Sequence, residues 1–347
     1  MTFQSKSEIS LLIIYTGGTI GMVKDPQTGA LQPFDIYNLY HHIPVLENYP
    51  FNIDSYSFDP LIDSSNITPE FVIKIAEVIK NNYESHDGFV VLHGSDTMAY
   101  TASILSFVLE NLNKPVILTG SQLPLGVLRS DGRENFINSI EIASANDDGT
   151  PLVPEVSICF ENELYRGNRT HKGNAEDFGA FKSDNFHNLA DIGVNIKYHK
   201  SHILKPNFKK LKVHKKLDDN VVVLKLFPGI RQQTVNAILN IKDLRGVIIE
   251  TYGSGNAPNH QWFLNEIKEA IDKGIIFYSV TQCEGGSVET GKYETSVELY
   301  KMGVISGYDI TTEAALAKMM YILGRNFSDS EAKELLQKPL RGEMTVL

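Results

Sequence analysis

The sequence predicts an α/β protein of two domains: a larger N-terminal domain with a mostly parallel sheet and flanking helices, and a smaller C-terminal parallel α/β domain. Three observations lead to this fold class. The chain has 347 residues, more than one ordinary core needs. Runs of β-forming residues alternate with helical patterns in both halves, and a polar, basic stretch without clear periodicity separates them. We therefore expect domains at 1–195 and 219–347, joined by a linker at 196–218.

The N-terminal domain is predicted from alternating strands and helices. The expected strands cover residues 9–15, 88–92, 115–119 and 156–160. A helix over 69–81 has two start signals, because Thr68 can cap it and Pro69 can occupy its first position. A second helix is expected over 98–111. This alternation favours a parallel sheet with helices on its faces.

The C-terminal domain shows the same alternation. Its expected strands are 221–227, 246–251 and 274–280, and its expected helices are 231–241, 258–272 and 312–323. A last helix begins at Ser328, because the Ser328 hydroxyl and the Glu331 carboxylate can form a capping box. The stretch before this domain, from 195 to 218, contains eight lysines and three histidines, which is typical of a solvated linker.

Composition and charge narrow the classes of function. The formal net charge of −10 argues against a nucleic-acid partner, because phosphate binding needs clustered Lys and Arg. The apolar run at 11–15 is too short for a signal peptide or a transmembrane helix. Only two cysteines occur, Cys159 and Cys283, which suits a reducing compartment without a disulfide framework. We expect a cytoplasmic protein without a membrane partner.

Two short motifs carry most of the functional information. Residues 16–20 (TGGTI) and 93–99 (HGSDTMA) each follow a predicted buried strand, where α/β proteins usually locate their chemistry. The glycine turns let backbone N–H groups point toward a ligand, and Thr19, Ser95 and Asp96 add two hydroxyls and a carboxylate. Together they predict a hydroxyl-nucleophile site.

A hydroxyl becomes an effective nucleophile only when a base removes its proton. The stretch 166–172 follows a predicted strand and offers Lys172, which can be that base if it is neutral part of the time. Next to Ser95 and Asp96 it would form a Ser–Lys–Asp relay, although a lysine in a loop is more often simply solvated. His93, beside the second glycine turn, is expected to be structural rather than a general base.

Several other active-site motifs do not occur in the sequence. No Gly-Lys-Ser/Thr follows the first glycine turn, so there is no P-loop. Residues 253–258 end in proline where a dinucleotide fingerprint needs glycine. Neither a G-x-S-x-G elbow nor an H-E-x-x-H motif is found. We therefore expect neither a cofactor nor a metal.

The pairing of residues 16–21 with residues 92–102 resembles the two signatures of the bacterial-type asparaginase/glutaminase family, and in particular its type I, cytoplasmic branch. The resemblance covers nearly the whole chain. Further segments with counterparts in the family are Leu61–Ser65, Pro115–Gln122, Arg129–Gly132, Tyr165–Lys172, Tyr252–Pro258 and Leu340–Glu343. It implies hydrolysis of L-asparagine to L-aspartate and ammonia.

The resemblance also implies catalytic roles. Thr19 matches the threonine that attacks the side-chain amide and forms an acyl-enzyme. Ser95 matches a second threonine, which forms the proton relay with Lys172 and Asp96. In this chain the hydroxyl is kept but a methyl group is lost, and we expect a more loosely packed relay.

Substrate-binding roles follow from the same resemblance. Asp96 would also hold the substrate α-ammonium, and Ser64, with Ser65, its α-carboxylate. The backbone carbonyl of Ser121 would orient the leaving amide nitrogen. Asn256 falls in a segment that the family donates from a neighbouring subunit, so we expect a homodimer or a homotetramer.

The chain departs from the family pattern at two further places. Many members carry a tyrosine in the loop after the nucleophile, yet residues 25–32 contain none, and Tyr293 of an adjacent subunit is the predicted substitute. Some type I members bind a second asparagine with an arginine and a threonine, where this chain has Glu250 and His171. An anion in place of a carboxylate-binding arginine predicts loss of that effector site.

Two other functions remain as alternatives. One is the amidase subunit of an archaeal-type tRNA amidotransferase. The excess of acidic over basic residues and the absence of an extra N-terminal docking domain argue against this function. The other is a non-catalytic amino-acid-binding or scaffold protein, which would be expected to lack Thr19, Asp96 or Lys172. The ratio of asparagine to glutamine activity is not predictable, because one methylene changes selectivity by only about 1–3 kcal/mol.

Overall fold

The computed structural model describes residues 9–24, 31–33, 43–44, 46, 50–125, 127–289 and 294–346. These residues form two compact units. The first runs to Ser183 and adds His187–His214, and the second comprises Asp184–Phe186 and Lys215–Leu347. Among the described residues, no helix is both long enough and apolar enough to cross a membrane.

An eight-stranded sheet forms the core of the first unit, in the order β15-β14-β11-β10-β7-β5-β1-β4. Its strands are β1 (Ile9–Tyr15), β4 (Phe51–Ser57), β5 (Gly88–Leu92), β7 (Val116–Thr119), β10 (Val156–Phe160), β11 (Glu163–Arg166), β14 (Ala190–Ile192) and β15 (Ile196–Tyr198). Neighbours from β4 to β10 pair in parallel, and the three strands beyond β10 pair antiparallel. The predicted mostly parallel sheet is confirmed, and the three antiparallel strands at one end were not predicted.

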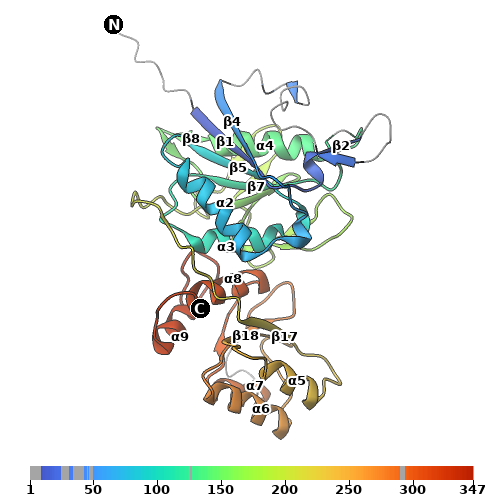
Figure 1. The fold of residues 1–347 in the computed structure, drawn as a ribbon, viewed down its shortest axis with the longest axis vertical. Helices are drawn as coiled ribbons and strands as arrows, with labels where there is room; N and C mark the ends of the chain where they lie inside the picture. The colour runs from blue at the N-terminus through green and yellow to red at the C-terminus, as the bar shows by residue number, and fades with distance from the viewer. Residues whose placement is uncertain are drawn as a thin grey trace. The chain divides into compact units, whose positions relative to one another are not determined.

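Helices cover both faces of this sheet, as Figure 1 shows with α2 and α3 on one side and α4 on the other. The helix α2 (Pro69–Asn81) begins as predicted, with the Thr68 hydroxyl accepting from the N–H of Phe71. The helix α3 (Met98–Val108) ends earlier than predicted, because Leu109 and Glu110 form the short strand β6. Every residue of β5, β7 and β10 is buried, as expected for parallel strands between two helical layers.

The sequence did not predict several elements of this unit, among them β4, α4 and the antiparallel strands β11, β14 and β15. The strand β4 alternates between half-buried and exposed residues because it lies at the sheet edge, next to β1. The helix α4 (Gly132–Ser144) packs against the central strands. Its sequence mixes polar and apolar residues, so the apolar face of the helix is not evident from the sequence pattern.

The segment 196–218, predicted as a linker, is structured in its first part. Its residues up to His214 cluster with the first unit. The strand β16 (Lys212–Val213) pairs with β6. The Asn113 side chain accepts from the backbone N–H groups of Asn207 and Phe208, at 2.8 and 2.9 Å. Backbone contacts of this kind fix a polar segment without any apolar periodicity.

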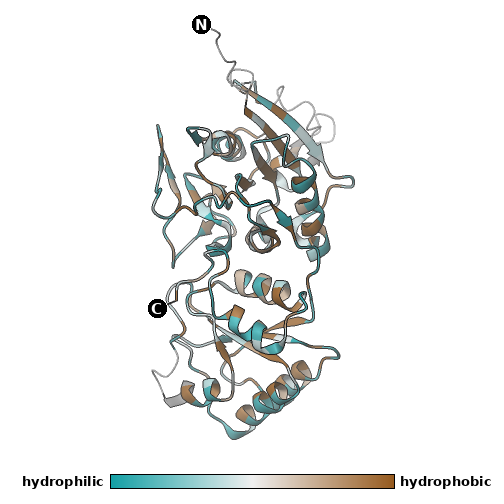
Figure 2. Ribbon diagram, turned by 90° about the vertical axis from the view of Figure 1, so that its left-hand side faces the viewer, coloured by the Kyte–Doolittle hydropathy of each residue, from teal (hydrophilic) through white to brown (hydrophobic). Residues whose placement is uncertain are grey.

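The second unit contains a four-stranded parallel sheet in the order β17-β18-β19-β20. Its strands are β17 (Val221–Lys225), β18 (Gly246–Thr251), β19 (Ile276–Thr281) and β20 (Ile305–Ser306). Its helices are α5 (Gln232–Leu239), α6 (Gln261–Asp272), α7 (Glu294–Lys301), α8 (Thr312–Leu323) and α9 (Asp329–Leu336). The predicted capping box at Ser328 and Glu331 is present. In Figure 2 the helices of this unit alternate hydrophobic and hydrophilic residues, which is typical of amphipathic helices.

Candidate active site

The first glycine turn directly follows β1. Thr16 continues the strand, because its N–H and its hydroxyl both donate to the carbonyl of Leu92, at 3.0 and 2.9 Å. The chain then forms one short 3-10 helix, η1 (Thr19–Gly21), which carries the predicted nucleophile at its first position. Thr19 is partly exposed, while the Ile20 that follows it is buried. The turn therefore presents a hydroxyl residue at the carboxyl end of a buried strand.

Three chain segments meet at this turn without room for side chains. A Cβ on Gly18, whose φ is 90°, would lie 2.5 Å from the backbone nitrogen of Gly94. A Cβ on Gly17 would lie 2.2 Å from the carbonyl oxygen of Ile62, and one on Gly94 would lie 2.5 Å from the Ser64 Oγ. Glycine at these positions allows the segments bearing Thr19, Ser64 and Ser95 to approach one another.

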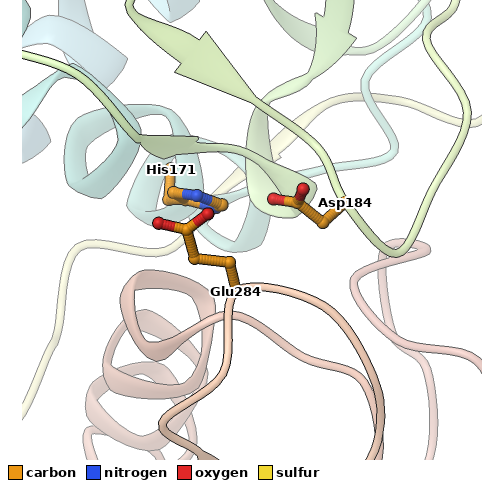
Figure 3. A group of neighbouring side chains, drawn as sticks. All are labelled: His171, Asp184 and Glu284. Atoms are coloured by element: carbon orange, nitrogen blue, oxygen red, sulfur yellow. The ribbon is translucent and has the colours of Figure 1, made fainter.

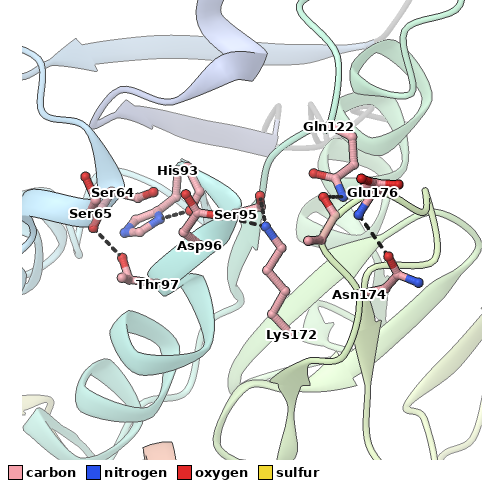
Figure 4. Close-up of polar contacts among 12 residues, drawn as sticks. Ser64, Ser65, His93, Ser95, Asp96, Thr97, Gln122, Lys172, Asn174 and Glu176 are labelled. Atoms are coloured by element: carbon pink, nitrogen blue, oxygen red, sulfur yellow. Dashed lines mark hydrogen bonds and ion pairs between the residues drawn. The ribbon is translucent and has the colours of Figure 1, made fainter.

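The second glycine turn carries the predicted relay. It follows β5 and contains η5 (Ser95–Thr97), which leads directly into α3. The Lys172 Nζ donates to the Ser95 Oγ at 2.9 Å and lies 2.7 Å from the Asp96 Oδ1 (Figure 4). The Lys172 side chain is 16% exposed and that of Asp96 is 66% exposed, so the pair lies at the surface of the unit. The structure thus brings together three residues that are up to 77 positions apart.

Lys172 reaches this position through the segment that precedes it. A Cβ on Gly167, in η6 (Gly167–Arg169), would lie 2.9 Å from the Cβ of Ala102, so η6 packs directly on α3. The Arg166 guanidinium forms a buried ion pair with Glu155 at 2.7 Å. Lys172 then lies in β12 (His171–Lys172), which pairs with β13 (Phe181–Lys182).

His93 lies beneath the second turn and is fully buried. Its Nδ1 contacts the carbonyl oxygen of Gly94 at 2.6 Å, and its Nε2 contacts the Thr101 hydroxyl at 2.9 Å. Burial lowers the pKa of His93 to about 4, and the contact with Gly94 opposes this shift. A neutral, enclosed imidazole supports the expectation of a structural role.

The serines expected to bind the substrate carboxylate lie in η4 (Ser64–Asn66). Ser64 is 5% exposed, whereas Ser65 is exposed. The Asp63 carboxylate caps this turn by accepting from the N–H and the hydroxyl of Ser65, and these bonds lower the pKa of Asp63. The Thr97 hydroxyl donates to the Ser64 carbonyl at 2.7 Å, which ties η4 to η5.

Ser121 lies in a loop that other residues hold in place. It is 2% exposed, and its hydroxyl donates to the carbonyl of Leu123 at 2.6 Å. The Asp131 carboxylate accepts from the N–H groups of Gln122 and Leu123. The Gln122 amide donates to the carbonyls of residues 175 and 177, in the loop after Lys172 (Figure 4). These supporting roles of Gln122 and Asp131 were not predicted from the sequence.

Two predicted site residues are not part of this cluster as described. Asn256 belongs to the second unit, where its backbone N–H and carbonyl bond to those of Tyr252 at 2.8 and 2.9 Å. Tyr293 lies outside the described residues, as do residues 25–30 of the loop that lacks a tyrosine. Their predicted roles stay predictions.

One group of side chains raises the question of a metal. Figure 3 draws three such side chains: His171, on β12 of the first unit, and Asp184 and Glu284, two exposed residues of the second unit. Exposed carboxylates are common without an ion. Because His171 belongs to the other unit, we assign no metal-binding role to this group.

Comparison with known proteins extends over both units. The chain matches the family models "Asparaginase, N-terminal" over residues 10–204 and "Glutaminase/Asparaginase C-terminal domain" over residues 220–336. L-asparaginase 1 of Escherichia coli K12 is 42% identical over 341 residues, which cover 97% of this chain and 98% of the relative. The crystal structure of L-asparaginase I from Vibrio cholerae has a TM-score of 0.88 at 40% identity, covering 98% of this chain and 100% of that chain. A component of the glutamyl-tRNA(Gln) amidotransferase of Methanobrevibacter smithii is 32% identical over 357 residues, which cover 98% of this chain and 77% of the relative.

Proposed function

Because the chain belongs to the asparaginase family, we propose that it hydrolyses L-asparagine to L-aspartate and ammonia. One observation in the structure carries the proposal. The Lys172 Nζ contacts both the Ser95 hydroxyl, at 2.9 Å, and the Asp96 carboxylate, at 2.7 Å. This arrangement can relay a proton, and it lies where the turn bearing the Thr19 hydroxyl packs against the turn bearing Ser95.

In the proposed mechanism the Thr19 Oγ attacks the carbon of the substrate side-chain amide. Its proton passes through Ser95 to Lys172, which must be neutral to accept it, and from there to the leaving nitrogen. The C–N bond breaks, ammonia departs, and an aspartyl ester remains on Thr19. A water molecule then attacks the ester, the relay accepts the water proton and returns one to Thr19, and aspartate is released.

Substrate orientation is proposed to come from groups outside the nucleophile turn. The Asp96 carboxylate is 66% exposed and can accept the substrate α-ammonium. Ser64 and Ser65 can donate to the α-carboxylate, while the backbone carbonyl of Ser121 orients the amide nitrogen. These contacts bind the ground state, whereas Thr19 acts mainly in the transition state.

An ammonia-release assay with L-asparagine, L-glutamine and their D-forms tests the proposal. L-asparagine is expected to give the largest kcat/KM without any added partner protein. A requirement for glutamine and a partner would favour the amidotransferase alternative, and no turnover of any amide would favour a binding protein.

The assignment of the nucleophile needs its own test, because Lys172 contacts Ser95 rather than Thr19. Thr19→Ala is expected to abolish turnover while the fold and the binding of L-aspartate remain, since it removes a transition-state interaction. Residual activity above about a tenth of the wild-type value contradicts this role. Mass spectrometry of the trapped ester, on Thr19 or on Ser95, distinguishes the two hydroxyls.

We also propose that Tyr293 and Asn256 complete the site of a neighbouring subunit in a homodimer or homotetramer. The Thr19→Ala and Tyr293→Phe variants, each crippled alone, are denatured, mixed and refolded together. In a mixed dimer one site combines an intact Thr19 with an intact Tyr293, so part of the activity is expected to return. If Tyr293 serves its own chain, every site carries one lesion and mixing restores nothing.

A further inference from the structure

The turn that carries Thr19 is supported at its far end by a buried tyrosine. Tyr15, the last residue of β1, is 1% exposed, and its hydroxyl donates to the carbonyl of Gly21 at 2.7 Å. Gly21 is the last residue of η1. We propose that Tyr15 is a positioning residue, which fixes η1 so that the Thr19 hydroxyl is oriented for attack. This inference rests on the proposed function.

The turn is held at two points, with Thr19 between them. At its start, Thr16 makes two bonds to the carbonyl of Leu92, and its own carbonyl accepts from the N–H of Ile62 at 2.9 Å. At its end, the Tyr15 hydroxyl holds Gly21. Between these points the N–H of Gly21 donates to the carbonyl of Gly18 at 3.3 Å. The phenol of Tyr15 thus closes a loop of six residues that begins directly after Tyr15 itself.

The ring of Tyr15 also fixes the turn sterically. A Cβ on Gly21 would lie between 2.1 and 2.3 Å from three atoms at the hydroxyl end of this ring. The ring therefore packs directly against the backbone of Gly21. Both the hydrogen bond and the packing act on the backbone of the turn, at Gly21.

The environment of Tyr15 fits a fixed donor rather than a proton carrier. Burial raises the pKa of the Tyr15 phenol well above its ordinary value of 10. The hydroxyl therefore stays protonated over the working range of an enzyme and can donate to the Gly21 carbonyl throughout. Its removal is expected to change the orientation of Thr19 without changing the groups that titrate during turnover.

The test is Tyr15→Phe, which keeps the ring and removes the hydroxyl. A misplacement of about 1 Å in a reacting group can cost about 100-fold in rate, so kcat is expected to fall between about 10- and 100-fold. The KM for L-asparagine and the Kd for L-aspartate are expected to stay within about twofold, because other elements bind the α-groups. The shape of the pH profile of kcat is expected to stay the same.

A matched control exists in the second unit. Tyr278, in β19, is also buried, and its hydroxyl donates to the carbonyl of Leu336 at 2.9 Å. Tyr278→Phe removes the same kind of bond far along the chain from Thr19, so it is expected to lower stability and leave kcat unchanged. Comparing the two variants separates positioning of the nucleophile from a general loss of stability.

Several outcomes overturn the inference. An unchanged kcat in Tyr15→Phe does so, and so does a parallel loss of kcat and of L-aspartate binding, which would indicate a damaged fold. If Tyr15→Phe does not fold, Gly21→Ala provides a second test, because its added methyl group displaces the contact between Gly21 and Tyr15. This variant must lower kcat while the binding of L-aspartate is kept. If the wild-type protein releases no ammonia from any amide, the proposed function fails and the inference falls with it.

Discussion

One lysine–carboxylate pair of the first unit and one of the second have nearly equal lengths. Lys172 lies 2.7 Å from the Asp96 Oδ1 in the first unit, and Lys318 lies 2.8 Å from the Glu343 Oε1 in the second. Their burial differs. Asp96 is 66% exposed, whereas Lys318 and Glu343 are both 0% exposed. The distance alone therefore does not distinguish an ion pair that can take part in a reaction from one that stabilises the fold. The burial of the pair and its other hydrogen-bond partners distinguish them.

The remaining partners of each lysine explain the difference. Lys172 also donates to the Ser95 hydroxyl, a group that can pass a proton on. Lys318 instead donates to the carbonyls of Leu336 and Lys338, at 3.0 and 2.6 Å, which cannot exchange protons. Glu343 accepts from the backbone N–H groups of Leu340 and Arg341. The second pair thus holds the C-terminal segment on α8, and the first can take part in proton transfer.

Of the substitutions that test this comparison, Lys172→Arg is expected to have the largest effect on kcat. Arginine keeps the positive charge but does not give up its proton at ordinary pH, so it cannot act as the base. We expect a loss of kcat of about 10²- to 10⁴-fold, the usual contribution of general acid–base catalysis. The free energy of unfolding is expected to change by less than about 1 kcal/mol, because the pair is partly exposed. Steady-state kinetics and urea unfolding measure the two effects.

An active arginine variant would contradict the comparison, because it would show that charge alone matters at position 172. Lys172→Met provides the matched control. It removes the charge as well as the base, so it is expected to be no more active than the arginine variant.

The opposite pattern is expected for Lys318→Met. This change leaves the Glu343 carboxylate buried without its cation, which typically costs about 3–5 kcal/mol. The kcat of the molecules that remain folded is expected to stay at the wild-type value. The double variant Lys318→Met/Glu343→Gln removes the buried charge and is expected to recover part of the stability. If the double variant is no more stable than the single one, an uncompensated charge is not the cause.

His93 is a fully buried basic group without a carboxylate among its two ring contacts, which are Gly94 and Thr101. Burial lowers its pKa from 6.5 to about 4. The unfolded chain therefore binds a proton that the folded chain does not bind between these pH values. The stability that this group contributes is fully present above pH 6.5 and is lost as the pH falls toward 4, by about 3 kcal/mol in total.

Urea midpoints measured between pH 7 and pH 4 check this expectation. His93→Gln keeps a polar side chain and removes the titration, so the difference between wild type and variant must shrink as the pH falls. A difference that is independent of pH would show that His93 does not stay neutral in the folded protein.

The sequence predicted the candidate catalytic residues because they follow hydrophobic strands. Thr19, Ser95 and Asp96 directly follow buried strands, and parallel strands bring their carboxyl ends to one edge of the sheet. The supporting residues could not be found in this way. Tyr15, Gln122 and Asp131 act by bonding to the backbone of segments that only the fold brings near.

The fold likewise contains elements that the sequence predicted and elements that it did not. Strands with continuous apolar runs were predicted nearly to the residue, as β1 and β5 show. The edge strand β4 was missed because its inner positions are only half-buried, although its alternation is a usable signal. The first part of the predicted linker is structured by side-chain amides such as that of Asn113, which leave no periodic pattern in the sequence.

The smallest effect is expected at a third pair, which lies between the other two in exposure. Lys225 and Glu250 are register partners on β17 and β18, 3.0 Å apart, with side chains 64% and 13% exposed. Glu250 also accepts from the Thr312 hydroxyl at 2.9 Å. Since a pair with one solvated partner contributes about 0–1 kcal/mol, Glu250→Gln is expected to change the free energy of unfolding by less than about 1 kcal/mol.

The same residue bears on the saturation kinetics. The sequence resemblance implies that Glu250 replaces an arginine of the effector site expected in some family members, and here its carboxylate contacts a cation and a hydroxyl of its own unit. We therefore expect hyperbolic saturation by L-asparagine in both the wild type and this variant, because cooperativity requires a second site with different affinities in two states. Initial rates over a wide range of L-asparagine concentration measure this, and a Hill coefficient clearly above 1 would show that an effector site exists despite Glu250.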